Sequence, residues 1–398
     1  MVQGMFDLAA VQLAIRAQKL DGWLLYDFRG QNVLAARVLG MEEQGRSRRW
    51  AYFVPVVGEP KKLVHKIEPM ALDHLPGAEK TVYLRWQEFE EGIAGLVAGT
   101  RTVAMEYAPR NGNPYIGRVD AGTVELVRSC GVEVVSSGDL IQQFEAVWDE
   151  AQWAMHREAA VHTNRAYEIA WAYIAERLHA VGHTDELAVQ ARILRHFAEC
   201  QMTTYHPPIV GVGPHSGDPH YAPIEATNSR IVPGSFVLID LWAKLDRPRA
   251  VYSDLTRVGY IGEEVPAQYT RIFDIVAAAR DAGIATVVDA FATGTPLQGW
   301  EVDAATRAVI DAAGYGEFFT HRTGHNIGQE THGNGCHMDG LETKEERRVM
   351  PGTCFSIEPG IYLPEFGVRS EVNVYVHHDN TVHVTGGELQ REIFRVRI

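Results

Sequence analysis

Two segments of the 398-residue chain are near copies of each other, and this repeat constrains the fold more than any other feature. The first runs Arg230-Ile-Val-Pro-Gly-Ser-Phe-Val-Leu-Ile-Asp240, and the second runs Arg348-Val-Met-Pro-Gly-Thr-Cys-Phe-Ser-Ile-Glu358. In each, a Pro-Gly turn precedes a short apolar strand that ends on a carboxylate. A further acid follows each run, Asp254 in the first case and Glu371 in the second. Because buried acids are rare unless they are paired or bind a metal, two related hairpins are predicted to build one site.

The length of the chain indicates two domains, because one hydrophobic core seldom serves so many residues. Strand-like and helical segments alternate over residues 1–148, which predicts an N-terminal α/β domain. This segment contains no phosphate loop and no dinucleotide fingerprint, so it suggests no chemistry of its own. Over residues 149–398, long helices are followed by hairpins twice, so the second domain is predicted to consist of duplicated helix-hairpin halves. The expected fold class is therefore α/β, with α+β character in the second domain.

Composition and charge indicate which classes of partner and which cellular compartment to expect. The net charge is −14 and no basic block occurs, so nucleic acid is not an expected partner, and the charge itself favours solubility. The chain contains no apolar run long enough to span a membrane, and its N-terminus does not resemble a signal peptide. The four cysteines are scattered, which favours free thiols in a reducing cytoplasm over a disulfide framework. We therefore expect a cytoplasmic protein.

Three histidines lie between the two acid-bearing hairpins in the sequence, at positions 321, 325 and 332. A lone histidine is more often structural than a ligand, but three in one short stretch beside four placed acids favour a functional role. Four neighbouring carboxylates repel one another unless cations neutralise them. The sequence therefore predicts a pair of divalent metals, an arrangement that hydrolyses stable bonds.

The order of the acids and the histidine resembles the ligand set of the pita-bread metallopeptidases, a family that includes methionine aminopeptidase, aminopeptidase P, prolidase and the metal-free creatinase. The similarity covers residues 150–398 strongly, and 1–148 by the size and pattern of a creatinase-like α/β domain. The presence of that domain favours the Xaa-Pro peptidases over methionine aminopeptidase. The motifs that carry the resemblance are Pro-His220-Tyr, Ser-Asp254-Leu-Thr-Arg, Thr-Gly-His325-Asn-Ile-Gly, Ser-Ile-Glu358-Pro-Gly-Ile-Tyr and Val-Arg369-Ser-Glu371.

The resemblance implies a role for each of the five ligands. Asp254 and Glu371 would bridge both metals, Asp240 would hold one of them, and His325 and Glu358 would hold the other. Oxygen-rich ligands with one imidazole suit manganese, with cobalt, zinc or iron as alternatives. A water between the metals would lose a proton near neutral pH, and the resulting bridging hydroxide would attack the scissile carbonyl.

The resemblance also implies catalytic and substrate-binding residues around the metals. Glu358 would act as the general base, and His220 and His332 would contact the peptide bond and stabilise the tetrahedral intermediate. His321 matches a position in the proline pocket of aminopeptidase P. Arg369 lies two residues before Glu371, on the same face of a strand, so it either pairs with a ligand carboxylate or binds the substrate.

Two departures from the family pattern bear on the substrate. The spacing from Asp240 to Asp254 is longer than usual, which predicts an extended hairpin tip over Lys244–Ala250. The stretch 333–337 lacks the arginine with which prolidases often bind the carboxylate of a dipeptide. A charged loop over 41–49 is usually solvated surface, but one of its arginines, Arg46, Arg48 or Arg49, is an alternative carboxylate ligand.

Together these features predict a metallopeptidase of the Xaa-Pro dipeptidase (prolidase) kind, acting as a homodimer whose N-terminal domain contributes to dimerisation and substrate gating. The alternative within the family is aminopeptidase P, which acts on longer peptides before a proline. A catalytically inactive binding protein with the same fold would be expected to lack a ligand, His220 or His332, and none of these is missing.

Overall fold

The computed structural model describes residues 6–41 and 45–398, and these form two compact units, Met1–Glu145 and Ala146–Ile398. The sequence placed the division between residues 148 and 149. Each unit has its own hydrophobic clusters. Among the described residues, no helix combines the length and the apolar character needed to cross a membrane.

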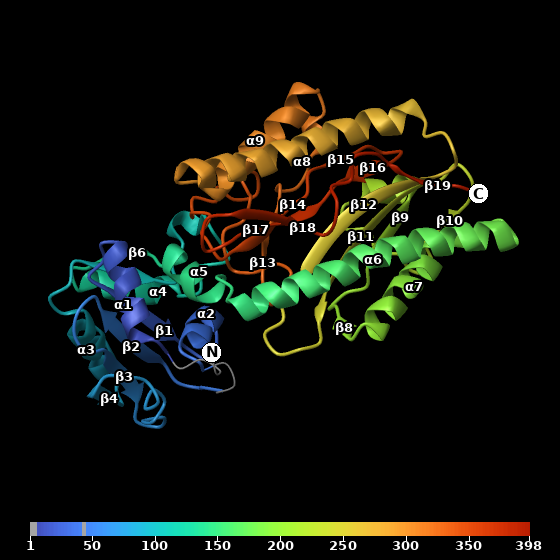
Figure 1. Ribbon diagram of the computed structural model, residues 1–398. Coiled ribbons are helices and arrows are strands. Elements are labelled where there is room, and N and C mark those ends of the chain that lie inside the picture. The colour runs from blue at the N-terminus through green and yellow to red at the C-terminus, as the bar shows by residue number, and fades with distance from the viewer. Residues whose placement is uncertain (1–5, 42–44) are drawn as a thin grey trace. The chain divides into compact units, whose positions relative to one another are not determined.

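The N-terminal unit is built on a six-stranded sheet in the order β4-β3-β2-β1-β5-β6. The central strand β1 (Gly22–Asp27) is buried throughout, because helices cover both faces of the sheet (Figure 1). Trp23 and Leu25 pack on one face, and Leu24 and Tyr26 pack on the other, as strand alternation requires. The other strands are β2 (Trp50–Pro55), β3 (Lys61–His65), β4 (Glu79–Tyr83), β5 (Thr102–Met105) and β6 (Glu133–Ser136), and the helices are α1 (Leu8–Ala17), α2 (Val33–Val38), α3 (Trp86–Val97), η1 (Pro109–Asn111), α4 (Ala121–Ser129) and α5 (Gly138–Glu145).

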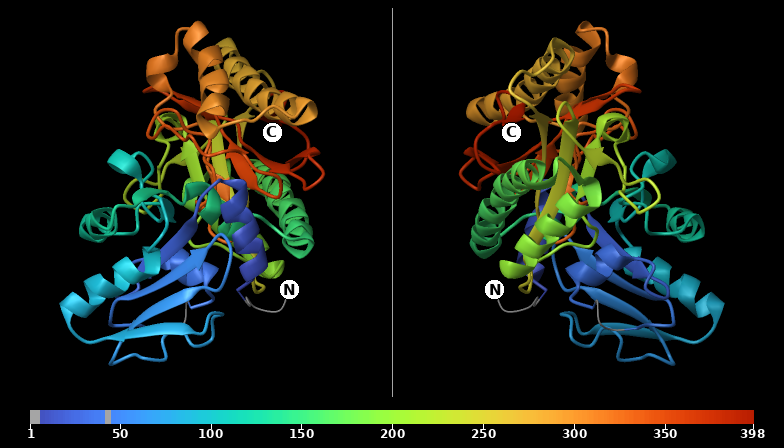
Figure 2. Two further views of the ribbon diagram at one scale, coloured as in Figure 1. Left: turned by 90° about the vertical axis from the view of Figure 1, so that its left-hand side faces the viewer. Right: turned by 90° about the vertical axis from the view of Figure 1, so that its right-hand side faces the viewer.

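The C-terminal unit consists of two halves that each begin with a long helix and a shorter one. The first half contains α6 (Glu150–Val181), β7 (Thr184–Asp185), α7 (Glu186–Glu199), β8 (Met202–Thr203), β9 (Ile209–Val212), η2 (Gly213–Gly217), β10 (Arg230–Ile231), β11 (Phe236–Leu245) and β12 (Ser253–Ile261). The second half contains α8 (Ala267–Thr293), α9 (Gly299–Ala312), η3 (Gly316–Phe318), β13 (Asn326–Ile327), β14 (Cys354–Ile357), β15 (Gly360–Tyr362), β16 (Gly367–Arg369), β17 (Val372–Val376), β18 (Val382–Thr385) and β19 (Phe394–Val396). Figure 2 shows these helices packed on the outside of the strands.

Matching contacts in the two halves confirm the predicted duplication. Arg230 pairs with Asp185, the residue that caps α7, and Arg348 forms an isolated bridge with Gln298, the residue that caps α9. The first strand of each acid hairpin also has an equivalent antiparallel neighbour, β9 beside β11 and β13 beside β14. The sequence repeat is therefore a repeat of structure.

The Pro-Gly turns that begin the two hairpins have the same conformation. Gly234 has φ +89° and Gly352 has φ +80°, a left-handed conformation that glycine adopts without strain. Each glycine donates its backbone N–H across the hairpin, Gly234 to the carbonyl of Ile261 and Gly352 to the carbonyl of Val376. The turns thus fix where both acid-bearing strands start.

The strand register brings the acids onto shared faces. In the first hairpin Asp240 lies opposite Thr256, and Asp254 lies opposite Trp242, so the two acids are diagonal neighbours. In the second hairpin Ile357 pairs with Val372, and the same register places Glu358 opposite Glu371, just beyond the paired strands.

The tip of the first hairpin lies two residues later in the chain than the predicted range Lys244–Ala250. Strand β11 continues through Leu245, because Lys244 and Leu245 pair with Met202 and Thr203 of β8. The return strand begins at Ser253, so residues 246–252 form the connection. A third strand from a distant part of the sequence therefore extends the hairpin, and sequence spacing alone does not show it.

Candidate metal centre

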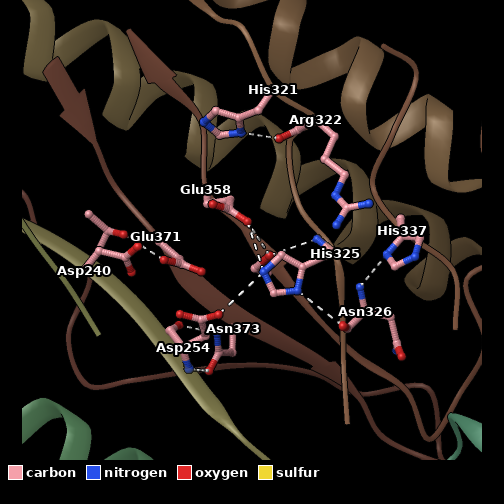
Figure 3. Close-up of polar contacts among 12 residues, drawn as sticks. Asp240, Asp254, His321, Arg322, His325, Asn326, His337, Glu358, Glu371 and Asn373 are labelled. Atoms are coloured by element: carbon pink, nitrogen blue, oxygen red, sulfur yellow. Dashed lines mark hydrogen bonds and ion pairs between the residues drawn. The ribbon is translucent and has the colours of Figure 1, made fainter. Parts of the chain in front are cut away.

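Acidic side chains from both hairpins of the C-terminal unit converge on His325, as Figure 3 shows. One ligand atom from each of Asp254, His325 and Glu371 lies within 4.8 Å of the others, and all three residues are buried. Asp240 is also buried. The structure therefore gathers side chains from β11, β12, the segment before β13 and the segment before β17 at one place.

His325 lies between two of the acids. Its Nε2 atom is 3.5 Å from Oδ2 of Asp254 and 3.3 Å from Oε1 of Glu358. The hydroxyl of Ser356 donates to the same Oε1 of Glu358 at 3.0 Å and accepts the backbone N–H of His325 at 2.9 Å. Ser356 thus holds the histidine and the acid in a fixed relation.

Arg369 and Thr256 join the remaining two acids. The guanidinium of Arg369 donates to Oδ2 of Asp240 at 2.5 Å and, through Nε, to the hydroxyl of Thr256 at 2.9 Å. That hydroxyl in turn donates to Oε2 of Glu371 at 2.8 Å. Arg369 also donates to the hydroxyl of Tyr362 at 3.0 Å and the carbonyl of Pro219 at 3.4 Å, and its Nε forms an ion pair with Oε2 of Glu358 at 3.9 Å. These contacts favour the alternative in which Arg369 pairs with a ligand carboxylate.

The donors present at this centre fit divalent cations. Oδ1 of Asp240 and Oε1 of Glu371 are buried, and neither has a hydrogen-bond partner among the described residues. A buried carboxylate oxygen without a partner is costly, and coordination to a cation would satisfy both. The set of carboxylates and one imidazole also suits hard to borderline divalent metals.

Burial and mutual repulsion make the acids resist ionisation in the protein alone. Burial, followed by the charge of Asp240, raises the pKa of Asp254 well above its usual value. Burial and the charge of Asp254 do the same to the pKa of Glu371. Burial also raises the pKa of Asp240, although Arg369 opposes the shift. A cluster that resists charging is one that positive ions would stabilise.

Glu358 behaves differently from these three acids. Burial raises the pKa of Glu358, but the hydrogen bond from His325 and the electrostatic effect of the neighbouring His325, His321 and Arg369 side chains lower it, and the net shift is downward. Glu358 is therefore ionised, with a carboxylate that can accept a proton.

His321 belongs to a hydrogen-bonded chain that reaches Arg369. Nδ1 of His321 is 2.7 Å from the carbonyl of Arg322, so this nitrogen carries the proton. Nε2 of His321 therefore accepts from the hydroxyl of Tyr362 at 2.7 Å, and that hydroxyl accepts from Arg369. Burial lowers the pKa of His321 to about 4, in agreement with a neutral ring. Both ring nitrogens are therefore engaged within the protein, and the ring of Phe319 lies edge-on to that of His321 with centroids 5.3 Å apart.

The other two predicted histidines lie near the same centre. The ring centroid of His332 is 4.3 Å from that of His325, with the rings nearly perpendicular. The neighbouring His325 is the main cause that lowers the pKa of His332 to about 3, and His220 also contributes. His220 is exposed, and Asp218 fixes its backbone by accepting its N–H at 3.0 Å.

Arg46 lies in the N-terminal unit, where its guanidinium donates to the carbonyl of Ala71 at 2.9 Å. In the same loop Arg48 donates to the carbonyl of Ser47, and Arg49 packs over the ring of Phe89. Residues 42–44 of the predicted loop lie outside the described residues. Binding of a substrate carboxylate by Arg46, Arg48 or Arg49 stays a prediction.

Sequence reasoning missed four residues that position the ligands: Thr256, Ser356, Tyr362 and Asn373. The amide oxygen of Asn373 accepts the backbone N–H of Asp254 at 3.0 Å. Strand alternation could have indicated Thr256 and Ser356, because each is two residues from a predicted ligand on the same face. No local pattern marks the hydroxyl of Tyr362 as a bridge between His321 and Arg369.

Comparisons with known proteins show which proteins this chain resembles. The probable dipeptidase PepE of Mycobacterium tuberculosis is 28% identical over 365 residues, covering 87% of this chain and 86% of that protein. The Xaa-Pro dipeptidase of Lactobacillus delbrueckii subsp. lactis is 30% identical over 234 residues, 58% of each chain. The crystal structure of dipeptidase PepE from Mycobacterium ulcerans shares the fold, with a TM-score of 0.68 at 24% identity, covering 98% of this chain and 97% of that one.

The model of metallopeptidase family M24 matches residues 154–378, which is more than half of the chain. The matched range contains Asp240, Asp254, His325, Glu358 and Glu371. This chain is thus a member of metallopeptidase family M24.

Proposed function

We propose that this protein is a two-metal dipeptidase that cleaves the bond between an amino acid and a C-terminal proline. The observation that supports the metal pair best is the convergence of four acids and one histidine, in which two buried carboxylate oxygens have no hydrogen-bond partner within residues 6–41 and 45–398. A single cation does not need so many anionic ligands, whereas two cations sharing bridging carboxylates do.

We assign the ligands as follows: Asp254 and Glu371 shared by both ions, Asp240 on one ion, and His325 and Glu358 on the other. When bound, the ions would neutralise the acids, lower the pKa of a coordinated water and polarise the carbonyl of the scissile bond. Thr256 is hydrogen-bonded to the carboxylate of Glu371, and Arg369 to that of Asp240. These bonds would orient the donor atoms before an ion binds.

The side chains around the centre would supply the remaining chemistry. Glu358 is ionised, and its Oε1 atom would accept a proton while Ser356 and His325 keep it in place. We assign His332 and His220 to contacts with the peptide bond, where an N–H donor would stabilise the negative charge that develops on the carbonyl oxygen.

The preference for proline rests on two kinds of support. One relative is named an Xaa-Pro dipeptidase, and others are named probable dipeptidases. In the structure, the ring nitrogens of His321 are both hydrogen-bonded and the ring of Phe319 packs beside it, so these two rings would offer the pyrrolidine of proline a mainly apolar contact. Because proline has no N–H, a pocket for it needs shape more than hydrogen-bond acceptors.

The test compares three peptides on the metal-loaded protein: Ala-Pro, Ala-Ala and Ala-Pro-Ala. We expect kcat/KM for Ala-Pro to exceed that for either of the others by at least tenfold. A preference for Ala-Pro-Ala would assign the aminopeptidase P activity instead, and a preference for Ala-Ala would assign a general dipeptidase. If none of the three is cleaved although two metals bind, the inactive binding protein would be the correct description.

Three further assignments accompany this proposal. We propose manganese as the physiological metal, with cobalt and zinc as competitors, because the oxygen-rich ligand set suits it. We also propose a cytoplasmic homodimer, in which the N-terminal unit contributes to dimerisation and substrate gating. Metal analysis of the purified protein tests the assignment of manganese. Sedimentation equilibrium tests whether the protein is a homodimer.

A further inference from the structure

Three potential metal ligands lie together on a helix pair in the first half of the C-terminal unit. His162 is on α6, His196 is near the end of α7, and Cys200 caps that helix. His196 and Cys200 are four residues apart, so their side chains share one face of the helix. One donor atom from each of the three side chains lies within 4.8 Å of the others.

The hydrogen bonds of His196 leave one ring nitrogen ready to bind a metal. Its Nε2 atom is 3.1 Å from the backbone carbonyl of His162, and a carbonyl only accepts, so Nε2 carries the proton. Nδ1 is then the nitrogen with a free electron pair, and Sγ of Cys200 lies 3.7 Å from Nδ1 and 3.9 Å from Nε2. A backbone carbonyl that fixes the tautomer in this way is the usual outer partner of a metal-bound histidine.

The separation of these two atoms matches a shared ion. In a tetrahedral zinc site, with Zn–S near 2.3 Å and Zn–N near 2.05 Å, the sulfur and the nitrogen are about 3.6 Å apart. The observed 3.7 Å is close to this separation. Because Sγ is also 3.9 Å from Nε2, the Cys200 side chain would have to turn toward the electron pair of Nδ1 to share an ion with it. A weak hydrogen bond from the thiol to Nδ1 would also fit this distance, but it would not explain why His162 is the third residue at the same place.

The packing of the two helices preorganises the three ligands. Apolar residues of α6 and α7 belong to one buried cluster that also covers β11, including Tyr167, Ile193 and Phe197. His196 itself is buried, while His162 and Cys200 are half-buried. An ion could therefore reach the ligands from solvent, and water could complete its coordination.

We propose that His162, His196 and Cys200 form a second metal site, for one Zn²⁺ ion per subunit, between α6 and α7. Two imidazoles and a thiolate favour zinc over manganese or magnesium, so the site differs in chemistry from the oxygen-rich centre. On binding, the thiol of Cys200 loses its proton to solvent and the sulfur coordinates the ion. This inference does not depend on the proposed peptidase activity.

The site would stabilise a segment that leads toward the acid hairpin. From Cys200 the chain continues through β8 to Tyr205. The ring of Tyr205 lies 5.9 Å from that of Trp242 and 6.1 Å from that of Tyr252, both on the hairpin that carries Asp240 and Asp254. A bound ion would join the end of α7 to α6 and restrain this segment.

Cobalt titration of the chelated, full-length protein tests the proposal. Co²⁺ bound to a thiolate gives an intense ligand-to-metal charge-transfer band that carboxylate and imidazole ligands do not give. We expect this band in the unaltered protein, its loss in Cys200→Ser, and its retention in Cys130→Ser, a half-buried cysteine of the N-terminal unit. We also expect the band to persist in Asp254→Asn, which separates the new site from the proposed catalytic centre.

A second measurement covers the case in which Cys200→Ser fails to fold. The rate at which iodoacetamide alkylates Cys200 in the unaltered protein is followed by peptide mass spectrometry with and without Zn²⁺. We expect Zn²⁺ to slow the reaction at Cys200 at least tenfold and to leave that at Cys130 unchanged. An absent charge-transfer band with cobalt bound, or equal alkylation rates at Cys200, would overturn the proposal.

Discussion

At the scale of single residues, the centre depends on side chains that bind no metal themselves. Thr256 is the clearest case, because its one hydroxyl accepts from Arg369 and donates to Glu371, while Arg369 also contacts Asp240. Two predicted ligands from different hairpins are thereby held through a single oxygen atom. Loss of that atom would leave both a buried guanidinium N–H and a buried carboxylate oxygen without a partner.

Thr256→Val removes this hydroxyl while keeping the shape of the side chain. We expect the affinity for divalent metal to fall roughly 10–100-fold, since partners behind the ligands typically contribute that much. Isothermal titration of the chelated protein with Mn²⁺ measures the change. Thr286→Val is the control, because its hydroxyl donates to the carbonyl of Ala282 within helix α8, and it should leave the affinity unaltered.

At the scale of elements, the two Pro-Gly turns share a conformation but not their surroundings. A Cβ atom on Gly234 would have no neighbour nearer than the Tyr260 hydroxyl at 3.9 Å. A Cβ atom on Gly352 would lie 2.6 Å from Cε1 of His378 and 2.7 Å from Cγ1 of Val147. The second turn is therefore packed by side chains that the first turn lacks.

Substitution of these glycines by alanine separates backbone strain from crowding. Gly234→Ala should lower the free energy of unfolding by about 1–2 kcal/mol, from the left-handed backbone alone. Gly352→Ala carries the same strain, and crowding should add about 1–3 kcal/mol. Urea denaturation of the two variants measures both values, and equal losses would show that the neighbours of Gly352 move aside freely.

The long helix α6 contains a buried histidine that should make the fold sensitive to acid. His156 donates from Nδ1 to the carbonyl of Tyr252 at 2.8 Å, and its Nε2 lies 2.7 Å from the hydroxyl of Thr385. Burial lowers the pKa of His156 from 6.5 to about 4. Between these values the unfolded chain binds the proton and the folded chain does not. The contribution of neutral His156 to the free energy of unfolding is therefore fully present above pH 6.5 and is lost as the pH falls toward 4.

His156→Asn keeps a donor for the carbonyl of Tyr252 but cannot be protonated. From pH 7 to pH 4, we expect the variant to lose roughly 3 kcal/mol less stability than the unaltered protein, the amount that the pKa shift represents. Urea denaturation at both pH values gives the difference. His179→Asn, on the exposed face of the same helix, is the matched control and should reproduce the unaltered pH dependence.

At the scale of the whole molecule, the proposed metal centre joins residues from two halves of the C-terminal unit that are distant in sequence. Asp240 and Asp254 come from the first half, and His325, Glu358 and Glu371 come from the second. Without cations, the mutual repulsion of these acids opposes the packing of the halves. With cations, the same acids hold the halves together, so stability and metal binding should be coupled.

This coupling predicts that the effect of Asp254→Asn on stability changes sign with metal. In chelated protein the substitution removes one buried charge, so the melting temperature should rise. With saturating Mn²⁺ it removes a bridging ligand, so the melting temperature should fall. Scanning calorimetry under both conditions tests this, with the exposed Asp274→Asn on α8 as the unaffected control. A fall in both conditions would falsify the proposed role of repulsion.

The sequence alone determined the duplication, the long-helix and hairpin order of each half, and the identity of the acids that converge with His325. These follow from local signals, because a Pro-Gly turn, strand alternation and an acid after an apolar run are all written within a few residues. The fold class and the family were predicted in this way and are confirmed. The assignment of each ligand to one metal or to both stays a prediction.

Only the tertiary structure decided how these side chains are supported and how far the hairpin extends. The pairing of β8 with β11, the bridge of Thr256 between Arg369 and Glu371, and the meeting of His162 with Cys200 all join segments that are distant in sequence. Such contacts depend on how helices and strands pack against a shared core. No local pattern encodes that packing. A single sequence can therefore identify the residues that carry the chemistry, but it does not identify the distant residues that hold them in place.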